Sequence, residues 1–241
     1  MNYTDKFTNT DINIHYIETN DHVTDSLPLV YIPGALGNAE QFIEEMKSLF
    51  PRHCISISLR GIGKSDAPLK GYTFEENILD ISSVIKKSGL NAYYLMAYSM
   101  GVPYAIQYAA TNPNEVKGLI LCDYPAKYPR IPEHWIENAK KFVPPNRCHV
   151  VEEIQKDSRE IILWEKLKEI NCPVLVLKGG TEQAILKEEA SMKYKSNLKN
   201  VELLEFTNSG HELWVPDYEK FIQSIKDFLT KIEAKNITIN I

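Results

Sequence analysis

A serine stands at the centre of residues 97–101, AYSMG, where an apolar strand pattern gives way to a helical pattern. A tight strand-to-helix turn holds its central side chain at the apex and crowds the residues two positions before and after it. Ala97 and Gly101 are small enough for such a turn. Ser99 is therefore predicted to be an exposed nucleophile, with the Met100 amide placed to donate to an oxyanion. A simpler interpretation makes Ser99 only a helix N-cap.

The base that would activate this serine is predicted to be His211. A serine hydroxyl is a poor nucleophile until a base removes its proton. His211 lies in residues 208–212, NSGHE, between the strand pattern at 201–206 and the last helix pattern. A loop in that position reaches the carboxyl end of a parallel sheet, where the serine turn also lies.

A third residue must orient the imidazole and stabilise its cation. Glu182 follows the strand pattern at 173–178 and precedes the histidine in the sequence, so it is the favoured acid. Asp123, directly after the strand pattern at 116–122, is the alternative. Glu182 could instead be a carboxylate that stabilises the start of a helix.

A glycine-rich loop, residues 33–37 (PGALG), follows the strand pattern at 27–32. Gly34 permits a close approach of the backbone, so the Ala35 amide is predicted to be the second oxyanion donor. An ordinary strand-to-helix turn would explain the same residues.

A second glycine-containing loop spans residues 60–66, RGIGKSD. Neither GxxxxGK[ST] nor GxGxxG occurs in it, so a phosphate-binding loop is not indicated. We interpret it as a structural turn in which Arg60 and Asp66 brace neighbouring loops.

Strand and helix patterns alternate along most of the chain. This alternation predicts an α/β fold with a mostly parallel sheet, helices on both faces and a ligand site beyond the carboxyl ends of the strands. A capping box at residues 73–76, TFEE, marks one helix start. The strand patterns lie at 11–19, 27–32, 53–59, 92–97, 116–122, 173–178 and 201–206, and the helix patterns at 38–50, 73–87, 100–110 and 218–232.

Residues 124–171 interrupt this alternation. They contain five prolines, no strand-like run and two or three short helical patterns, and they exceed the usual length of a connection. We expect a helical lid inserted into a core formed by residues 1–123 and 172–241. An apolar substrate pocket is predicted to be lined by Tyr98, Tyr124, Tyr128, Trp135 and Trp164, although the tryptophans could equally only fix the lid to the core.

Composition excludes several classes of protein. The chain has 241 residues, a formal charge of −5, 44% hydrophobic and 24% charged residues, as in soluble globular domains. It shows no basic footprint for nucleic acid, no apolar run long enough to span a membrane and no secretory signal. We therefore expect a cytoplasmic monomer or homodimer that binds neither nucleic acid nor membrane. No CxxC pair occurs, so no metal site is indicated and the cysteines are expected to be free thiols: Cys54, Cys122, Cys148 and Cys172.

Taken together, the segments PGALGN, RGIGKSDAP, AYSMG, KGGTE and NSGHE resemble the α/β-hydrolase superfamily, in its small esterase type with a single lid. They occur in the order nucleophile, acid, histidine over about residues 27–229. The resemblance implies a hydrolase without a cofactor, with Ser99 as nucleophile, His211 as base and the acid at Glu182. Ala35 and Met100 would supply the oxyanion amides.

Three residue types depart from the usual family pattern. Pro33 stands where the family often has histidine, Ala97 replaces the first glycine of the turn, and Glu182 replaces the commoner aspartate. None of these changes abolishes the chemistry, but the last one leaves the choice of acid open.

The expected reaction is hydrolysis of an ester, thioester or lactone of a small to medium apolar substrate through an acyl-enzyme. Hydrolysis of a C–C bond or an amide by the same residues remains an alternative. A ligand-binding receptor that keeps the same residues and an inactive scaffold are two others. Dehalogenases and epoxide hydrolases of this fold resemble the chain less, because they carry aspartate where Ser99 stands.

Overall fold

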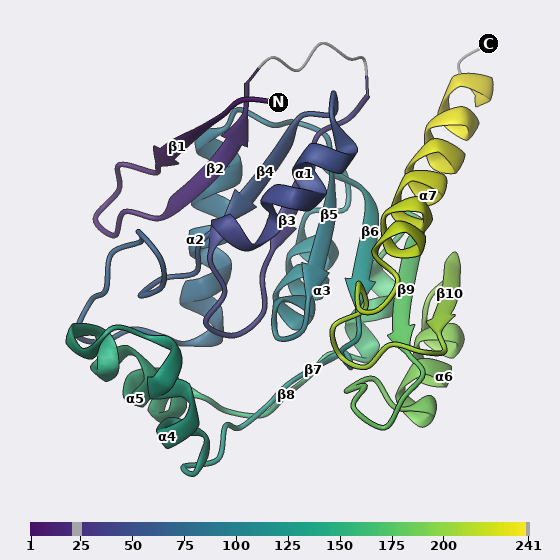
Figure 1. Cartoon of the computed structure of the whole chain (residues 1–241). Coiled ribbons are helices and arrows are strands. Elements are labelled where there is room, and N and C mark those ends of the chain that lie inside the picture. Colours follow the sequence, from purple (N-terminus) through teal and green to yellow (C-terminus); the bar gives the residue numbers. More distant parts are fainter. Residues whose placement is uncertain (21–25, 240–241) are drawn as a thin grey trace.

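The computed structural model describes residues 1–20 and 26–239, and its centre is an eight-stranded sheet (Figure 1). The strand order is β1-β2-β4-β3-β5-β6-β9-β10. Strands β4 to β10 in this order run parallel, whereas β2 is antiparallel to both β1 and β4. The strands are β1 (Tyr3–Phe7), β2 (His15–Thr19), β3 (Leu29–Ile32), β4 (Cys54–Ile57), β5 (Tyr93–Tyr98), β6 (Val116–Cys122), β9 (Val174–Gly179) and β10 (Val201–Phe206).

The central strands are buried on both faces. Every residue of β3 and β4 is buried, as are all but the last residue of β5, which explains their continuous apolar runs. The edge strand β1 is exposed throughout, and its polar sequence gave no strand pattern. Asp5 and Lys6 on β1 place charge on this edge, which discourages pairing with another chain.

Helices cover both faces of the sheet, as predicted. Side chains of α1 and α7 pack with one hydrophobic cluster, and those of α2, α3 and α6 pack with the other. The α2 capping box is confirmed: the Thr73 hydroxyl accepts from the Glu76 amide, and the Glu76 carboxylate accepts from the Thr73 amide. These helices are α1 (Ile43–Leu49), α2 (Phe74–Lys87), α3 (Gly101–Thr111), α6 (Glu188–Asn197) and α7 (Tyr218–Ile239).

Residues 124–171 form a separate group of short elements. Figure 1 shows α4 (Trp135–Ala139) and α5 (Cys148–Asp157) beyond the carboxyl ends of the central parallel strands, joined to the sheet by β7 (Lys127–Tyr128) and β8 (Ile161–Ile162). The expectation of no strand in this stretch is wrong, because β7 and β8 pair antiparallel. Two-residue strands are too short to leave an alternating pattern in the sequence.

Helix α5 is fixed to the turn at residues 60–66. Val150 is fully buried, and Arg147 Nη1 donates to the carbonyls of Gly61 and Ser65 at 2.9 and 3.0 Å. Among all the helices in the described residues, none combines the length and the apolarity needed to cross a bilayer.

Candidate active site

Ser99 lies at the turn between β5 and α3 in a left-handed backbone conformation, with φ of +54°. The segments of the protein around this turn pack so closely that glycine is required at two positions. A Cβ atom on Gly101 would lie 2.4 Å from the Pro33 carbonyl oxygen, and one on Gly34 would lie 2.8 Å from Ser99 Cβ. The turn therefore presents the serine side chain directly beside the glycine-rich loop after β3.

Hydrogen bonds join Ser99, His211 and Asp123. His211 Nε2 lies 2.9 Å from Ser99 Oγ, and His211 Nδ1 lies 2.8 Å from Asp123 Oδ2. The imidazole is half-buried and the aspartate is fully buried. A carboxylate on Nδ1 favours the tautomer with its proton on Nδ1, which leaves Nε2 free to accept the serine proton.

Asp123 is held by the backbone around it. It follows β6 with φ of +47°, and its amide donates to the Leu177 carbonyl at 2.8 Å. Its carboxylate accepts hydrogen bonds from three backbone amides, those of Gly179, Ile185 and Leu186, at 3.1, 2.8 and 3.3 Å. These three amides fix the position and orientation of the buried carboxylate.

The expectation that Glu182 contacts His211 is wrong, and the alternative residue, Asp123, takes that position. Glu182 is exposed, and its carbonyl accepts from Lys187 Nζ at 2.9 Å. Strand β6 lies directly beside β5 in the sheet, so its end is next to the serine turn. The loop after β9 contributes backbone amides to Asp123 and not a carboxylate to His211.

Ala35 and Met100, the predicted oxyanion donors, line one narrow cavity of about 20 Å³. Trp135 of α4 and Ile154 of α5 close it from the side of residues 124–171. The structure thus brings both predicted donors and one predicted pocket residue to one cavity. Met100 directly follows Ser99 in the sequence, but Ser99 itself does not line this cavity.

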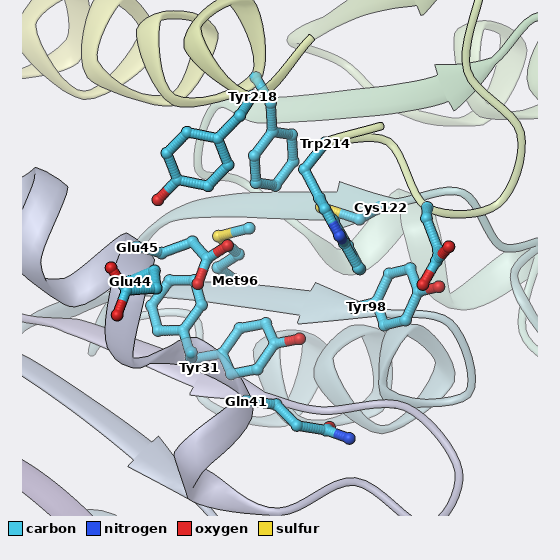
Figure 2. A pocket seen from close by; sticks show the side chains of 12 residues that line it. Tyr31, Gln41, Glu44, Glu45, Met96, Tyr98, Cys122, Trp214 and Tyr218 are labelled. Carbon is cyan, nitrogen blue, oxygen red and sulfur yellow. The ribbon is translucent and has the colours of Figure 1, made fainter. Parts of the chain in front are cut away.

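Tyr98 packs against the imidazole of His211. Its ring stacks on that of His211 with centroids 4.7 Å apart, and the Trp214 ring meets its edge at 5.0 Å. Figure 2 shows Tyr98 and Trp214 in the wall of a second, larger cavity. Burial raises the pKa of the Tyr98 phenol, so this ring is neutral at physiological pH. Sequence reasoning missed Trp214, although it lies three residues after the histidine.

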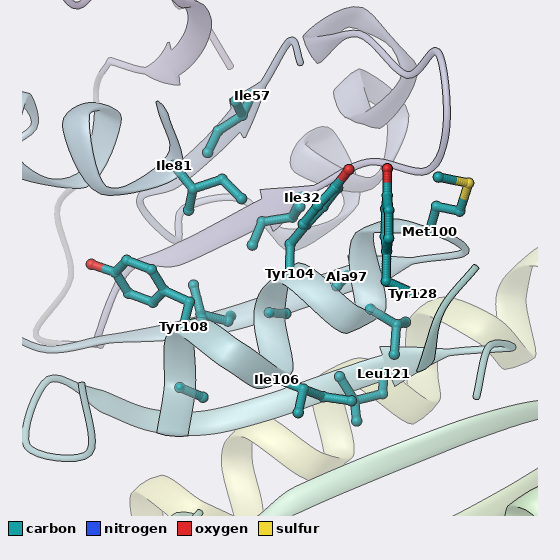
Figure 3. Packing of buried hydrophobic residues seen from close by; sticks show 14 of the residues in the cluster. Ile32, Ile57, Ile81, Ala97, Met100, Tyr104, Ile106, Tyr108, Leu121 and Tyr128 are labelled. Atoms are coloured by element: carbon teal, nitrogen blue, oxygen red, sulfur yellow. The ribbon is translucent and has the colours of Figure 1, made fainter. Parts of the chain in front are cut away.

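The remaining predicted pocket residues make packing contacts. Tyr128 is buried against Phe74 and Tyr104, with ring centroids 5.1 and 5.6 Å away (Figure 3). Trp164 meets the edge of Tyr194 at 5.3 Å, and the Tyr194 hydroxyl donates to the carbonyl of Tyr124 at 2.9 Å. Tyr124, Tyr128 and Trp164 therefore connect the segment 124–171 to the core. For Trp164, this agrees with the interpretation that the tryptophans fix the segment to the core.

The turn at residues 60–66 is structural, as predicted. Arg60 forms a bidentate ion pair with Asp80 of α2: Nε donates to Oδ2 at 2.6 Å and Nη2 donates to Oδ1 at 2.8 Å. The Asp66 carboxylate accepts from the Asn13 amide at 2.8 Å. Arg60 and Asp66 therefore brace two different neighbours, a helix and the chain before β2.

One group of possible metal ligands occurs among the described residues: Asp5, His15 and Glu40. Lys64 Nζ already contacts both carboxylates, at 2.5 Å from Asp5 and 3.3 Å from Glu40. The Lys64 ammonium supplies the positive charge at this cluster, in which Asp5 is exposed and His15 is buried, so we assign no metal to it.

Comparison with known proteins shows consistent similarity to one family. A family model described as the alpha/beta hydrolase fold matches residues 28–144. The chain is 27% identical to the AB hydrolase superfamily protein YisY of Bacillus subtilis (strain 168), over 89% of this chain and 98% of that protein.

Two further similarities are to proteins named as a lipase and as an esterase. Lipase 3 of Moraxella sp. (strain TA144) is 32% identical over 43% of this chain and 33% of its own length. The solved structure of an esterase from Exiguobacterium antarcticum superposes with a TM-score of 0.74, at 20% identity, over 91% of this chain and 96% of that one. At that identity the structural likeness shows the fold alone.

Proposed function

This chain belongs to the α/β-hydrolase superfamily, and we propose that it is a serine hydrolase that cleaves carboxylic esters, thioesters or lactones of small to medium apolar substrates. The observation that carries the proposal is the pair of hydrogen bonds from Ser99 Oγ to His211 Nε2, at 2.9 Å, and from His211 Nδ1 to Asp123, at 2.8 Å. The similarity to a lipase supports the choice of an ester carbonyl.

In the first half of the proposed reaction, Ser99 Oγ attacks the carbonyl carbon while His211 Nε2 takes the hydroxyl proton. The imidazolium that forms is stabilised by the Asp123 carboxylate. The developing oxyanion lies between the Ala35 and Met100 amides. Collapse of this intermediate expels the alcohol or thiol, which receives the proton from His211, and leaves an acyl group on Ser99.

In the second half, His211 takes a proton from water, and the resulting hydroxide equivalent attacks the acyl-enzyme carbonyl. The oxyanion again lies between the two amides. Collapse breaks the bond to Ser99 Oγ, which regains a proton from His211, and the carboxylic acid leaves. Each proton that His211 accepts is returned within the same half-reaction, so the enzyme ends unchanged.

The narrow cavity lined by Ala35 and Met100, the residues that follow Gly34 and Ser99, supports a preference for short acyl groups. Its walls include the apolar side chains of Leu59, Ile62 and Trp135, and its free volume is only about 20 Å³. In this proposal the segment 124–171 acts as a lid, because Trp135 and Ile154 lie over the cavity. A long acyl chain would need α4 or α5 to move.

The test is steady-state hydrolysis of p-nitrophenyl acetate, butyrate and octanoate by the wild type, Ser99→Ala and His211→Gln. We expect multiple turnover by the wild type and a loss of about 10³-fold or more in kcat for each variant. The matching p-nitroanilides test the amide alternative. Near wild-type turnover by Ser99→Ala would refute the proposal. Absence of turnover on all esters, together with ligand-dependent thermal stabilisation, would favour a receptor.

A further inference from the structure

A cavity of about 470 Å³ lies between α1, α7 and the sheet, and its lining shares no residue with the narrow cavity. It is large enough for a small organic molecule. Six aromatic rings contribute to its wall: Tyr31, Phe42, Tyr98, Trp214, Tyr218 and Phe221. None of these side chains has a role in the proposed hydrolysis. We call this space the aromatic cavity.

The charged side chains of the aromatic cavity are all acidic. Among the described residues that line it are three glutamates, Glu44, Glu45 and Glu212, and no lysine, arginine or histidine. Glu44 belongs to the rim, since 71% of its side chain is exposed and it pairs with Lys47 at 2.6 Å. Glu212 is also exposed. The negative potential at the mouth favours the approach of a cation.

Glu45 is different, because it is only 8% exposed and lies on the inner side of α1. Figure 2 shows its carboxylate beside Tyr31 and Met96, facing across the cavity from Tyr98 and Trp214. No donor in the described part of the chain reaches Glu45 Oε2. A buried carboxylate oxygen without a donor costs free energy that a positively charged donor would recover.

We infer that the aromatic cavity binds a small organic ammonium ion, a protonated primary or secondary amine with an apolar body. Its N–H groups would donate to Glu45 Oε2, and its apolar body would lie between the rings. Aromatic faces attract such cations, with Trp the strongest of the three aromatic types. The inference holds whether or not Ser99 is a nucleophile.

Other ligands fit these groups less well. A hard metal ion takes six or more oxygen ligands, whereas this wall is mostly aromatic carbon. A quaternary ammonium ion would satisfy the rings but has no N–H for Glu45 Oε2. Anions would meet three glutamates and, among the described lining residues, no cationic side chain. Burial and the nearby Glu44 charge raise the pKa of the Glu45 carboxyl, and a bound ammonium ion would lower it.

Isothermal titration calorimetry at neutral pH with three matched probes tests this inference. Benzylammonium carries charge and N–H donors, benzyltrimethylammonium carries charge alone, and benzyl alcohol is neutral. We expect benzylammonium to bind at least tenfold more tightly than either of the others. Equal affinity for benzyl alcohol and benzylammonium would overturn the inference, because it would remove the role of Glu45.

Variants locate the binding. Glu45→Gln keeps the shape of the side chain and should weaken benzylammonium binding tenfold or more, whereas Glu189→Gln, on α6 and outside the aromatic cavity, should change it less than twofold. Trp214→Ala should weaken binding and Trp135→Ala, at the narrow cavity, should not. The tryptophan pair decides the question if Glu45→Gln does not fold. Unchanged affinity in Glu45→Gln, or equal losses in both tryptophan variants, would contradict the assignment.

Discussion

Ser99 and Asp123 both hold left-handed backbone conformations, with φ of +54° and +47°. Residues other than glycine rarely adopt this region, and each instance costs on the order of 1–3 kcal/mol. Hydrogen bonds to the surrounding backbone hold both residues in this conformation. The Ser99 amide donates to the Cys122 carbonyl at 3.0 Å, and the Asp123 amide donates to the Leu177 carbonyl at 2.8 Å. Two of the four left-handed non-glycine residues in the described part of the protein therefore lie at the two ends of the hydrogen-bonded series Ser99, His211 and Asp123.

Relief of this strain is measurable at Ser99. We expect Ser99→Gly to be more stable than Ser99→Ala by about 1 kcal/mol, because glycine adopts positive φ without a Cβ clash. Both variants lack the hydroxyl, so their difference reports the backbone and not the lost hydrogen bond. Urea unfolding of the two proteins measures it. Greater stability of Ser99→Ala would contradict the strained geometry.

The choice of acid is tested by a pair of variants. Asp123→Asn should lower kcat/KM for p-nitrophenyl butyrate by about 10⁴-fold, because an amide on Nδ1 stabilises neither the required tautomer nor the imidazolium. Glu182 is exposed, so Glu182→Gln should change kcat/KM less than twofold. Circular dichroism controls for folding. The reverse ranking of the two variants would return the role to Glu182.

At the scale of elements, the sequence predicts those parts of the site that have a local pattern. The small residues around Ser99 and the loop position of His211 each depend on neighbours in sequence. The acid depends on which strand end lies beside β5, and the strand order places β6 there, with β9 one strand further away. No local pattern contains that order, so the prediction favoured Glu182 over Asp123.

The same reasoning explains the other differences. Strand β1 is exposed and polar, so it forms by pairing with β2 and not by an apolar alternation. The aromatic cavity requires α1, α7 and the end of β5 to meet, and these elements are far apart in the chain. An aromatic residue suits a pocket wall and a packing contact equally well, so the sequence could not distinguish the two roles for Tyr128 and Trp164. The structure shows that they contact Tyr104 and Tyr194.

The short elements of residues 124–171 should set the acyl specificity. Trp135→Ala removes the largest side chain at the narrow cavity, so kcat/KM for the octanoate ester should rise relative to the acetate ester by about tenfold. Trp164→Phe, which lies at the contact with Tyr194, should leave this ratio unchanged. An unchanged ratio in Trp135→Ala would show that α4 does not limit the acyl chain.

At the scale of the whole molecule, the antiparallel strands are tied to the parallel sheet by Glu18 of β2. Its carboxylate contacts His53 Nε2 at 2.8 Å and Lys6 Nζ at 2.6 Å. Burial raises the pKa of Glu18, but the hydrogen bonds from His53 and Lys6 outweigh it, and the net pKa is lowered below 4.5. The ionised carboxylate therefore stabilises the folded state.

This lowered pKa predicts how stability depends on pH. A carboxyl whose pKa is lower in the folded state contributes stability above its unfolded value, and the contribution is lost as pH falls through the folded value. Glu18→Gln should cost roughly 1 kcal/mol at about pH 7 and almost nothing at about pH 3. Urea unfolding at both pH values measures the difference. An equal cost at both values would contradict the role of the charge.

The central claim is that Ser99 is a nucleophile activated by His211 and Asp123. Intact-mass labelling with a fluorophosphonate, followed by peptide mapping, tests it without knowledge of the substrate. The account predicts one adduct per wild-type chain, located on Ser99, no adduct on Ser99→Ala, and much slower labelling of Asp123→Asn than of Glu182→Gln. A folded wild type that forms no adduct, or an adduct that persists in Ser99→Ala, would contradict it.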